Sequence, residues 1–321
     1  MRNASWRLRL SLSTMELMSS FTSPLSTADV HAAADRIRPY ARRTPLLRAE
    51  VDGRSVMLKL EHLQRSGSFK VRGALNGMLS GSPRDHIVTA SGGNHGLGVA
   101  TAAALLGMAA TVYVPESVPK AKARRIEAAG AKLIRHGAHY AEAAEAAADF
   151  AAQPGHRYLH AYNDPIVVAG QGTLGAEVIA DAPDADAVVV AAGGGGLAAG
   201  TALAIGDRRT VIVEPRFCCS AHDALAAGRP VDSPVDSVAS SALGATRMGD
   251  VPFAVLSTGN VHSVLVDDER ILSARDRLWE EFRIAAEPAA ATTFAAWLAG
   301  DVPGDLACLV ICGANTDWHA A

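Results

Sequence analysis

Three glycine-containing segments have the residue types that bind an anion through backbone N–H groups. They are Gly-Ser-Phe-Lys at 67–70, Ser-Gly-Gly-Asn-His at 91–95 and four consecutive glycines at 193–196. Each is expected to follow a strand and to open a helix, whose first N–H groups have no partner within the helix and attract a phosphate or carboxylate. Any one of these segments taken alone is equally well explained as a tight turn between a strand and a helix.

The four glycines at 193–196 are the strongest of these signals. Each residue without a Cβ costs roughly 0.5–1 kcal/mol of backbone entropy relative to alanine, so we expect something, such as a phosphate, to approach this backbone closely. The spacing fits neither common nucleotide motif. A dinucleotide-binding loop needs a glycine at Leu197 or Ala198, and a P-loop needs a Gly-Lys-Ser/Thr sequence that does not follow here.

Lys70 is the side chain best placed for covalent chemistry. The chain uses lysine sparingly, since only five of its 30 basic residues are lysines and the rest are arginines. Lys70 ends the Gly-Ser-Phe-Lys segment at the expected start of a helix, where the helix dipole and partial burial favour the neutral, nucleophilic amine. An exposed loop lysine is the alternative interpretation. A nucleophilic lysine together with a phosphate-binding loop is typical of enzymes that use pyridoxal phosphate.

Short β-branched runs alternate with helical segments from residue 27 onward. Helices are expected at 27–41, from the loop at 67 to residue 79, and at 95–106, 119–129, 140–151, 165–181, 197–205 and 220–227. Strands are expected at 56–60, 86–90, 110–114, 132–135, 187–191 and 210–213. This alternation is typical of an α/β fold with parallel sheets flanked by helices. Because ligands bind at the carboxyl ends of parallel strands, the glycine-containing segments should meet at one site.

Several motifs together resemble the serine/threonine dehydratase and serine racemase family, a group of fold-type II pyridoxal phosphate-dependent enzymes. The matching stretches occur in the family's order over about residues 40–321 and are 59–64 (KLEHLQ), 67–74 (GSFKVRGA), 89–95 (TASGGNH), 163–165 (NDP) with 170–173 (GQGT), 193–196 (GGGG), 213–215 (VEP), 287–288 (EP) and 312–315 (CGAN). The resemblance implies a two-domain, tryptophan synthase β-like fold. Residues 25–85 and 164–321 would form the large cofactor-binding domain, and residues 86–163 the smaller domain inserted in it.

The resemblance also implies a role for each matched site residue. Lys70 would form the Schiff base with the cofactor and later act as the base at Cα. Cys312 would face the pyridine nitrogen, where the family often has serine, and a neutral group there suits β-elimination. The other implied cofactor contacts are Phe69 and Asn94 to the ring, and Gly193, Gly194, Gly195, Gly196 and Leu197 to the phosphate. The substrate carboxylate would bind to Ser91, Gly92, Asn94 and His95.

Two departures from the family bear on the reaction. Gly92 stands where the racemase has a second hydroxyl that serves the opposite face of the substrate, and glycine has no proton to give. Elimination needs an acid–base group on one face only, so this favours a dehydratase. The resemblance also implies a cation site at Glu214, the carbonyl of Cys218 and Ser220. A monovalent ion such as potassium is favoured there over a divalent one, and a plain loop without an ion is equally consistent.

We therefore predict a dehydratase (ammonia-lyase) that converts L-serine, L-threonine or a related 3-hydroxy amino acid to a 2-oxo acid and ammonia. The alternatives are a serine racemase or a 3-hydroxyaspartate dehydratase of the same family, and a small-molecule-binding regulatory protein on this scaffold. Ser240 and Ser241 stand where the family usually has an acidic residue and a glycine, so the substrate preference stays open.

The amino-acid composition limits which classes of partner and which cellular compartment are expected. A net charge of −3 and an aromatic content of 5% argue against nucleic-acid binding, and no apolar window has the character of a membrane span. Four cysteines without zinc or disulfide spacing favour a reducing cytoplasm, and the family implies a homodimer. Residues 1–24 are expected to be a disordered extension. Since the chain ends soon after Asn315, we expect no C-terminal regulatory domain.

Overall fold

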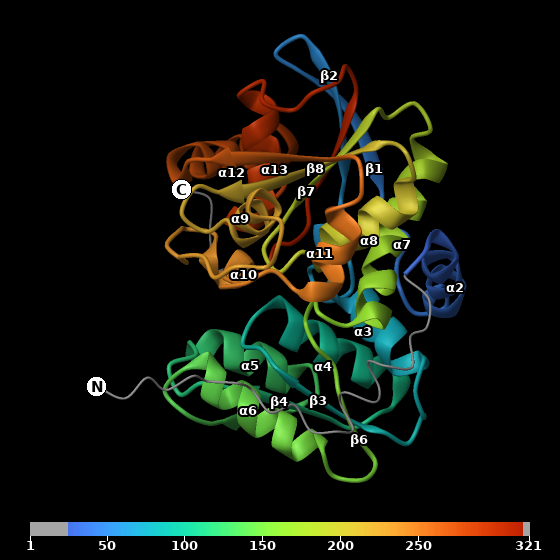
Figure 1. Ribbon diagram of the computed structural model, residues 1–321, viewed down its shortest axis with the longest axis vertical. Coiled ribbons are helices and arrows are strands. Elements are labelled where there is room, and N and C mark those ends of the chain that lie inside the picture. Colours follow the sequence, from blue (N-terminus) through green and yellow to red (C-terminus); the bar gives the residue numbers. More distant parts are fainter. Residues whose placement is uncertain (1–24, 317–321) are drawn as a thin grey trace.

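The structure is a computed structural model that describes residues 25–316, so the expected extension at residues 1–24 lies outside the described residues. Two sheets, each covered by helices, make up the described chain (Figure 1). The predicted α/β fold with parallel sheets flanked by helices is confirmed. Between residues 25 and 316 there is no helix long and apolar enough to cross a membrane.

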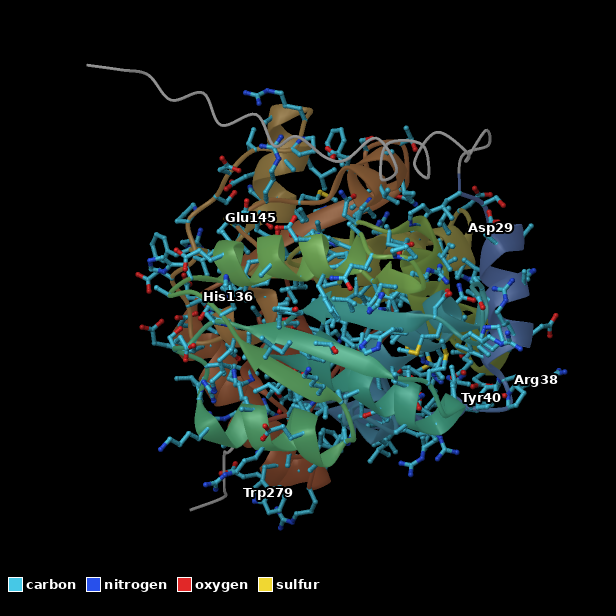
Figure 2. The ribbon with its side chains drawn as sticks, turned by 90° about the horizontal axis from the view of Figure 1, so that it is seen from below. Asp29, Arg38, Tyr40, His136, Glu145 and Trp279 are labelled. Carbon is cyan, nitrogen blue, oxygen red and sulfur yellow. The ribbon has the colours of Figure 1, made fainter. Side chains whose placement is uncertain are left out.

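Helices cover both sheets of the described chain (Figure 1). The helices are α2 (Thr27–Ile37), α3 (Lys70–Leu79), α4 (Asn94–Leu106), α5 (Lys120–Ala128), α6 (Tyr140–Ala151), α7 (Pro165–Asp181), α8 (Gly196–Ile205), α9 (Ser220–Ala227), α10 (Ser240–Leu243), α11 (Asp250–Leu256), α12 (Asp268–Phe282) and α13 (Pro288–Leu298), with a 3-10 helix η1 at Glu61–Leu63. In α2, Val30, Ala33 and Ile37 fall on one buried face. Asp29 and Arg38, near its two ends, point outward (Figure 2). This spacing is typical of a helix that covers a core.

The larger sheet has six strands in the order β1-β2-β10-β7-β8-β9. Its strands are β1 (Leu46–Val51), β2 (Arg54–Lys59), β7 (Ala187–Ala191), β8 (Arg209–Pro215), β9 (Val261–Val266) and β10 (Ala307–Val310). All neighbours pair in parallel except β1 and β2, which form a hairpin. Asp52 and Gly53 turn this hairpin with φ values of 52° and 71°, the left-handed conformation that a two-residue hairpin turn requires.

The smaller sheet has four parallel strands in the order β5-β4-β3-β6. They are β3 (His86–Ala90), β4 (Ala110–Val114), β5 (Lys132–Arg135) and β6 (His156–Tyr158). Because successive side chains of a strand face opposite sides, Ile87 packs in the core shared with α3 and α4, whereas Val88 packs against α6. The domain boundaries at 85/86 and 163/164 concern folding units and stay a prediction.

A buried ionic cluster anchors the first turn of α3. The Arg72 guanidinium donates to the carboxylates of Glu61 (2.7 and 2.8 Å) and Glu177 (2.8 and 3.0 Å), and the Lys59 ammonium donates to Glu177 at 2.6 Å. Lys59, Glu61 and Arg72 are at most 1% exposed. Two cations and two carboxylates balance, and buried charges persist only when paired in this way. The cluster ties the start of α3, where Lys70 lies, to β2 and α7.

Glycines also bring α3, α7 and α8 into close contact. A Cβ at Gly170 would lie 2.8 Å from the Cα of Gly73, and a Cβ at Gly172 would lie 2.5 Å from the carbonyl oxygen of Gly200. Any side chain there would push these helices apart. Gln171 lies between these glycines of α7, and its side-chain oxygen accepts a hydrogen bond of 3.1 Å from the backbone N–H of Gly73. The close packing sets the position of α3 beneath the site.

Candidate active site

Lys70 is the first residue of α3, directly after the loop that follows β2 and η1. Its ammonium donates a hydrogen bond of 2.9 Å to the carbonyl of Ala161 and lies 5.2 Å from the centre of the Phe69 ring. Burial lowers the pKa of Lys70 to about 8, although the nearby Cys312 thiol acts in the opposite direction. The predicted setting of a nucleophilic amine is therefore present in the structure.

The segment around Ala161 links Lys70 to the four glycines. His160 accepts hydrogen bonds at Nδ1 from the backbone N–H groups of Tyr162 and Asn163, at 3.2 and 2.9 Å. Burial and then the charge of Lys70 lower the pKa of His160 to about 4, so the ring is neutral. The Tyr162 ring packs edge-on against His160 and also covers Gly194. Sequence reasoning missed His160 and Tyr162, whose only signal is their place just before the Asn-Asp-Pro turn.

The four glycines form the loop from β7 into α8, as predicted, and their neighbours explain the absence of side chains. A Cβ at Gly194 would overlap the Tyr162 ring, and one at Gly193 would lie 2.8 Å from the carbonyl oxygen of Leu243. Gly195 has a φ of +89°, which disfavours any side chain. Protein neighbours, and not only a bound phosphate, therefore require glycine here.

The same loop has unpaired donors that suit a phosphate. No acceptor within residues 25–316 takes the backbone N–H groups of Gly193, Gly194, Gly195, Gly196 or Leu197. The glycines and Leu197 are nearly all buried, and a buried unpaired N–H is costly unless a partner binds. Gly196 and Leu197 open α8, where the helix dipole favours an anion. These residues fit the phosphate of pyridoxal phosphate.

The loop from β3 into α4 gives Asn94 and His95 different surroundings. Asn94 donates from Nδ2 to Glu287 at 2.6 Å and accepts at Oδ1 from Asn315 at 2.7 Å. His95 is 3% exposed and its Nε2 donates to the carbonyl of Leu159 at 3.1 Å, which leaves Nδ1 without a partner among the described residues. Burial, followed by the charge of Lys70, lowers the pKa of His95 to about 3. His95 is therefore a neutral, buried ring.

Ser91 and Cys312 each accept a hydrogen bond from a backbone N–H group. The Ser91 hydroxyl accepts from the backbone N–H of Gly93 at 3.2 Å, which shapes the turn. The carbonyl of Cys312 accepts from the N–H of Phe69 at 3.1 Å. Burial, and then the Glu287 carboxylate, raise the pKa of the Cys312 thiol, which is therefore neutral. The role of Cys312 at the ring nitrogen stays a prediction.

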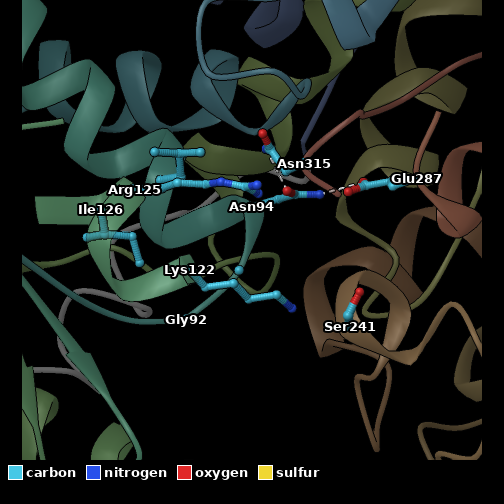
Figure 3. Close-up of a pocket in the computed structure, with 10 residues that line it drawn as sticks. Gly92, Asn94, Lys122, Arg125, Ile126, Ser241, Glu287 and Asn315 are labelled. Carbon is cyan, nitrogen blue, oxygen red and sulfur yellow. Dashed lines mark hydrogen bonds between the residues drawn. The ribbon is translucent and has the colours of Figure 1, made fainter. Parts of the chain in front are cut away.

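A small, partly open pocket lies beside Asn94 (Figure 3). Helix α5 contributes two half-buried cations to it, Lys122 and Arg125, which sequence reasoning did not assign to the site. Arg125 donates to the carbonyl of Thr316 at 3.4 Å, whereas Lys122 has no hydrogen bond or ion pair with residues 25–316. The pocket lining consists of Gly92, Gly93, Asn94, Leu97, Lys122, Arg125, Ile126, Ser241, Glu287 and Asn315. Positive charge at its wall suits an anionic substrate.

Two of the three implied ligands of the cation site, Glu214 and Ser220, have partners within the protein. The Glu214 carboxylate accepts from the backbone N–H groups of Ala221 (3.1 Å) and His222 (2.7 Å), in the first turn of α9. Ser220 donates to the carbonyl of Gly193 at 3.0 Å. At Cys218 the implied ligand is the carbonyl, and it is the thiol that donates to the carbonyl of Leu243, at 3.4 Å. Residues 25–316 hold no group of three or more His, Cys, Asp and Glu side chains with metal-binding geometry. The cation stays a prediction.

Known proteins resemble this chain over most of its length. The family model described as pyridoxal-phosphate dependent enzyme matches residues 37–313. The L-threonine ammonia-lyase of Geobacter sulfurreducens is 38% identical over 303 residues, which cover 90% of this chain and 75% of the relative. The serine racemase of Arabidopsis thaliana is 32% identical over 306 residues, with 90% and 92% covered. A solved threonine deaminase, from the organism abbreviated T.th., has a TM-score of 0.86 at 34% identity, over 92% of this chain and 100% of that chain.

Proposed function

Since this chain belongs to the family of pyridoxal-phosphate-dependent enzymes, as its motifs predicted, we propose that it is a dehydratase (ammonia-lyase) acting on L-serine, L-threonine or a related 3-hydroxy amino acid. The products are a 2-oxo acid and ammonia. The observation that carries the proposal is the pairing of a desolvated amine, Lys70, with a buried loop of unpaired N–H donors at 193–197. Relatives named threonine ammonia-lyase and threonine deaminase support the reaction.

The chain's own residues divide the work of holding the cofactor. When bound, pyridoxal phosphate supplies the sink for the electron pair released at Cα of an amino acid. Lys70 would be the attachment point, and the N–H groups of 193–197 would hold the phosphate. Phe69 and Asn94 would hold the ring, and the neutral Cys312 would lie at its nitrogen. Ser91, Gly92 and Asn94 would receive the substrate carboxylate together with the backbone N–H of His95, because the neutral His95 ring donates its single hydrogen to Leu159.

Lys70 is also the base of the reaction. With a pKa of about 8, the neutral Lys70 amine would accept the Cα proton, and passing this proton to the departing C3 hydroxyl would release water. Hydrolysis of the dehydrated product then gives the 2-oxo acid and ammonia. The residues expected on the substrate face opposite Lys70 favour elimination over racemisation. Gly92 provides no acid there, and a Cβ at Gly92 would lie 2.5 Å from the side chain of Val118. An apolar group thus occupies the place where a racemase needs a second proton donor.

Ammonia and 2-oxo acid release from L-serine, L-threonine and 3-hydroxyaspartate tests the function, with and without potassium and magnesium ions. We expect turnover of at least one of these substrates and loss of both turnover and the visible absorbance band in Lys70→Ala. The exposed Lys132 gives the matched control, Lys132→Ala, which should keep both. Retention of turnover in Lys70→Ala would sink the assignment.

Further assays on the same purified protein distinguish the alternative functions. A chiral assay of L-serine reports racemisation, which the apolar wall at Val118 disfavours. Lys122 and Arg125 supply the positive charge that the second carboxylate of 3-hydroxyaspartate would require, so that substrate is the second candidate. A colourless protein that binds amino acids without turnover would point to a regulatory binding protein.

We also propose a homodimer in the cytoplasm. All four cysteines are free and buried, which agrees with a reducing compartment. Sedimentation equilibrium of the purified protein tests the dimer, and a monomer at micromolar concentration would contradict it.

A further inference from the structure

A chain of hydrogen bonds with one direction crosses the pocket at Asn94. Asn315 donates from Nδ2 both to the carbonyl of Ser66 (3.0 Å) and to Oδ1 of Asn94 (2.7 Å). Asn94 then donates from Nδ2 to the Glu287 carboxylate at 2.6 Å (Figure 3). Both amides are therefore confined to one orientation, because a flipped Asn94 would turn a donor toward Asn315 and an acceptor toward Glu287.

Glu287 and Asn315, at the two ends of this series of hydrogen bonds, are themselves fixed in position. Glu287 is 4% exposed, and its backbone N–H donates to the carbonyl of Gly313 at 3.1 Å. A Cβ at Gly313 would overlap the Glu287 carboxylate, and a Cβ at Gly67 would lie 2.6 Å from Oδ1 of Asn315. Both glycines thus leave room for the side chains of Glu287 and Asn315. Lys122 and Cys312 are the titratable groups that face Glu287.

One donor of Asn94 remains without a partner. Its amide nitrogen carries two hydrogens, and within residues 25–316 Glu287 is the acceptor of only one of them. Asn94 lines the pocket, so the second hydrogen is available to a ligand. Accepting a bond at Oδ1 strengthens the amide as a donor, since hydrogen bonds in series polarise one another.

We propose that Glu287 and Asn315 are positioning residues that orient Asn94 so that its second Nδ2 hydrogen donates to the ring oxygen of pyridoxal phosphate. This inference rests on the proposed function and deepens it. Glu287 acts as an acceptor and Asn315 as a donor, and neither touches the reacting atoms. Without either one, Asn94 is free to present its carbonyl oxygen, which repels an anionic ring oxygen.

The test compares acceptor-keeping and acceptor-removing variants. Glu287→Gln keeps an oxygen for Asn94 but removes the charge, whereas Glu287→Leu removes the acceptor and Asn315→Ser shortens the donor. The dissociation constant of pyridoxal phosphate is measured by titration of the apoprotein, together with the absorbance maximum of the bound cofactor. Glu280→Gln, at an exposed residue of α12, is the matched control for loss of a carboxylate.

We expect Glu287→Leu and Asn315→Ser to weaken cofactor binding by about tenfold and to shift the absorbance maximum, since a lost hydrogen bond at a buried polar group has that effect. Glu287→Gln should stay within about threefold of the wild type. In an Asn94→Ala background, Glu287→Leu should have no further effect, because it acts through Asn94.

Wild-type binding and spectrum in either Glu287→Leu or Asn315→Ser would overturn the inference, as would a Gln variant as weak as the Leu variant. If Glu287→Leu does not fold, the comparison of Asn315→Ser with the wild type decides alone. A wild-type protein that binds no pyridoxal phosphate refutes the proposed function itself, whereas a wild type that binds it equally well in all variants refutes the positioning role only.

Discussion

At the scale of single residues, reactivity here depends on desolvation more than on charge pairing. Lys70 donates to a backbone carbonyl and meets no carboxylate among residues 25–316, so burial brings its pKa to about 8. At pH 7 about one tenth of such an amine is neutral, roughly 300-fold more than for an exposed lysine. The carboxylate that does lie in the pocket, Glu287, is held by Asn94 instead.

Gly194→Ala should destabilise the loop because a Cβ there overlaps the Tyr162 ring. We expect a loss of about 1–3 kcal/mol in the free energy of unfolding, the usual cost of overpacking, and weaker binding of pyridoxal phosphate. Urea unfolding checks the first effect and cofactor titration the second. Gly259→Ala is the control, since a Cβ there meets nothing closer than 3.4 Å. Equal stability of the two variants would contradict the packing argument.

Glu287 should make stability fall as the pH rises. Burial raises its pKa from 4.5 to about 7, so the folded protein binds a proton that the unfolded chain releases. Its contribution is full below pH 4.5 and is lost as the pH rises through about 7, by about 3 kcal/mol in all. Denaturant unfolding should therefore show Glu287→Gln gaining on the wild type between pH 5 and pH 8, with Glu280→Gln unchanged. Parallel pH profiles for Glu287→Gln and the wild type would be inconsistent with this.

The residue types predicted some of the site and missed the rest. Lys70, Asn94 and the four glycines were predictable because each stands at a fixed offset in a strand-to-helix loop. Glu287 and Asn315 were visible only as parts of matching motifs, since their partner Asn94 lies 193 and 221 residues away in the sequence. Lys122 had no local signal at all, because its role follows from where α5 packs.

At the scale of elements, the candidate site residues lie at the ends of helices and strands. Most helices and strands expected up to residue 227 are present, with ends that shift by a few residues. The helix expected at 27–41 ends at Ile37, and Arg38 still has helical dihedral angles. Pro39 has no backbone N–H to continue the helical hydrogen bonds. Strand β1 was not predicted, since it joins the sheet through a hairpin and not through a crossover helix. Pairing order depends on long-range packing that local patterns do not encode.

Arg72→Met should destabilise α3 as an element. It would leave the buried Glu61 carboxylate without its cationic partner, and breaking a buried ion pair costs about 3–5 kcal/mol. The free energy of unfolding from urea denaturation measures this. Arg48→Met, at an ion pair with Asp184 whose side chains are 50% and 49% exposed, is the matched control and should change little. A small effect of Arg72→Met would mean that the cluster does not anchor α3.

At the scale of the whole molecule, the site is assembled from both sheets. Asn94 begins the helix that follows β3 of the four-stranded sheet, whereas Lys70, the four glycines and Glu287 follow or precede elements packed on the six-stranded sheet. The α/β class and the meeting of loops at strand ends were predictable from alternation alone. Which loops face each other was not, because that depends on how the two sheets pack.

The central claim is that Lys70 carries pyridoxal phosphate in a dehydratase. After reconstitution, borohydride reduction makes a cofactor–lysine bond permanent, and peptide mapping by mass spectrometry then shows which of the five lysines is labelled. We predict a single label on Lys70, and loss of that label when L-serine or L-threonine is present during turnover. A label on Lys59, Lys120, Lys122 or Lys132, or on none of the five, would contradict the account.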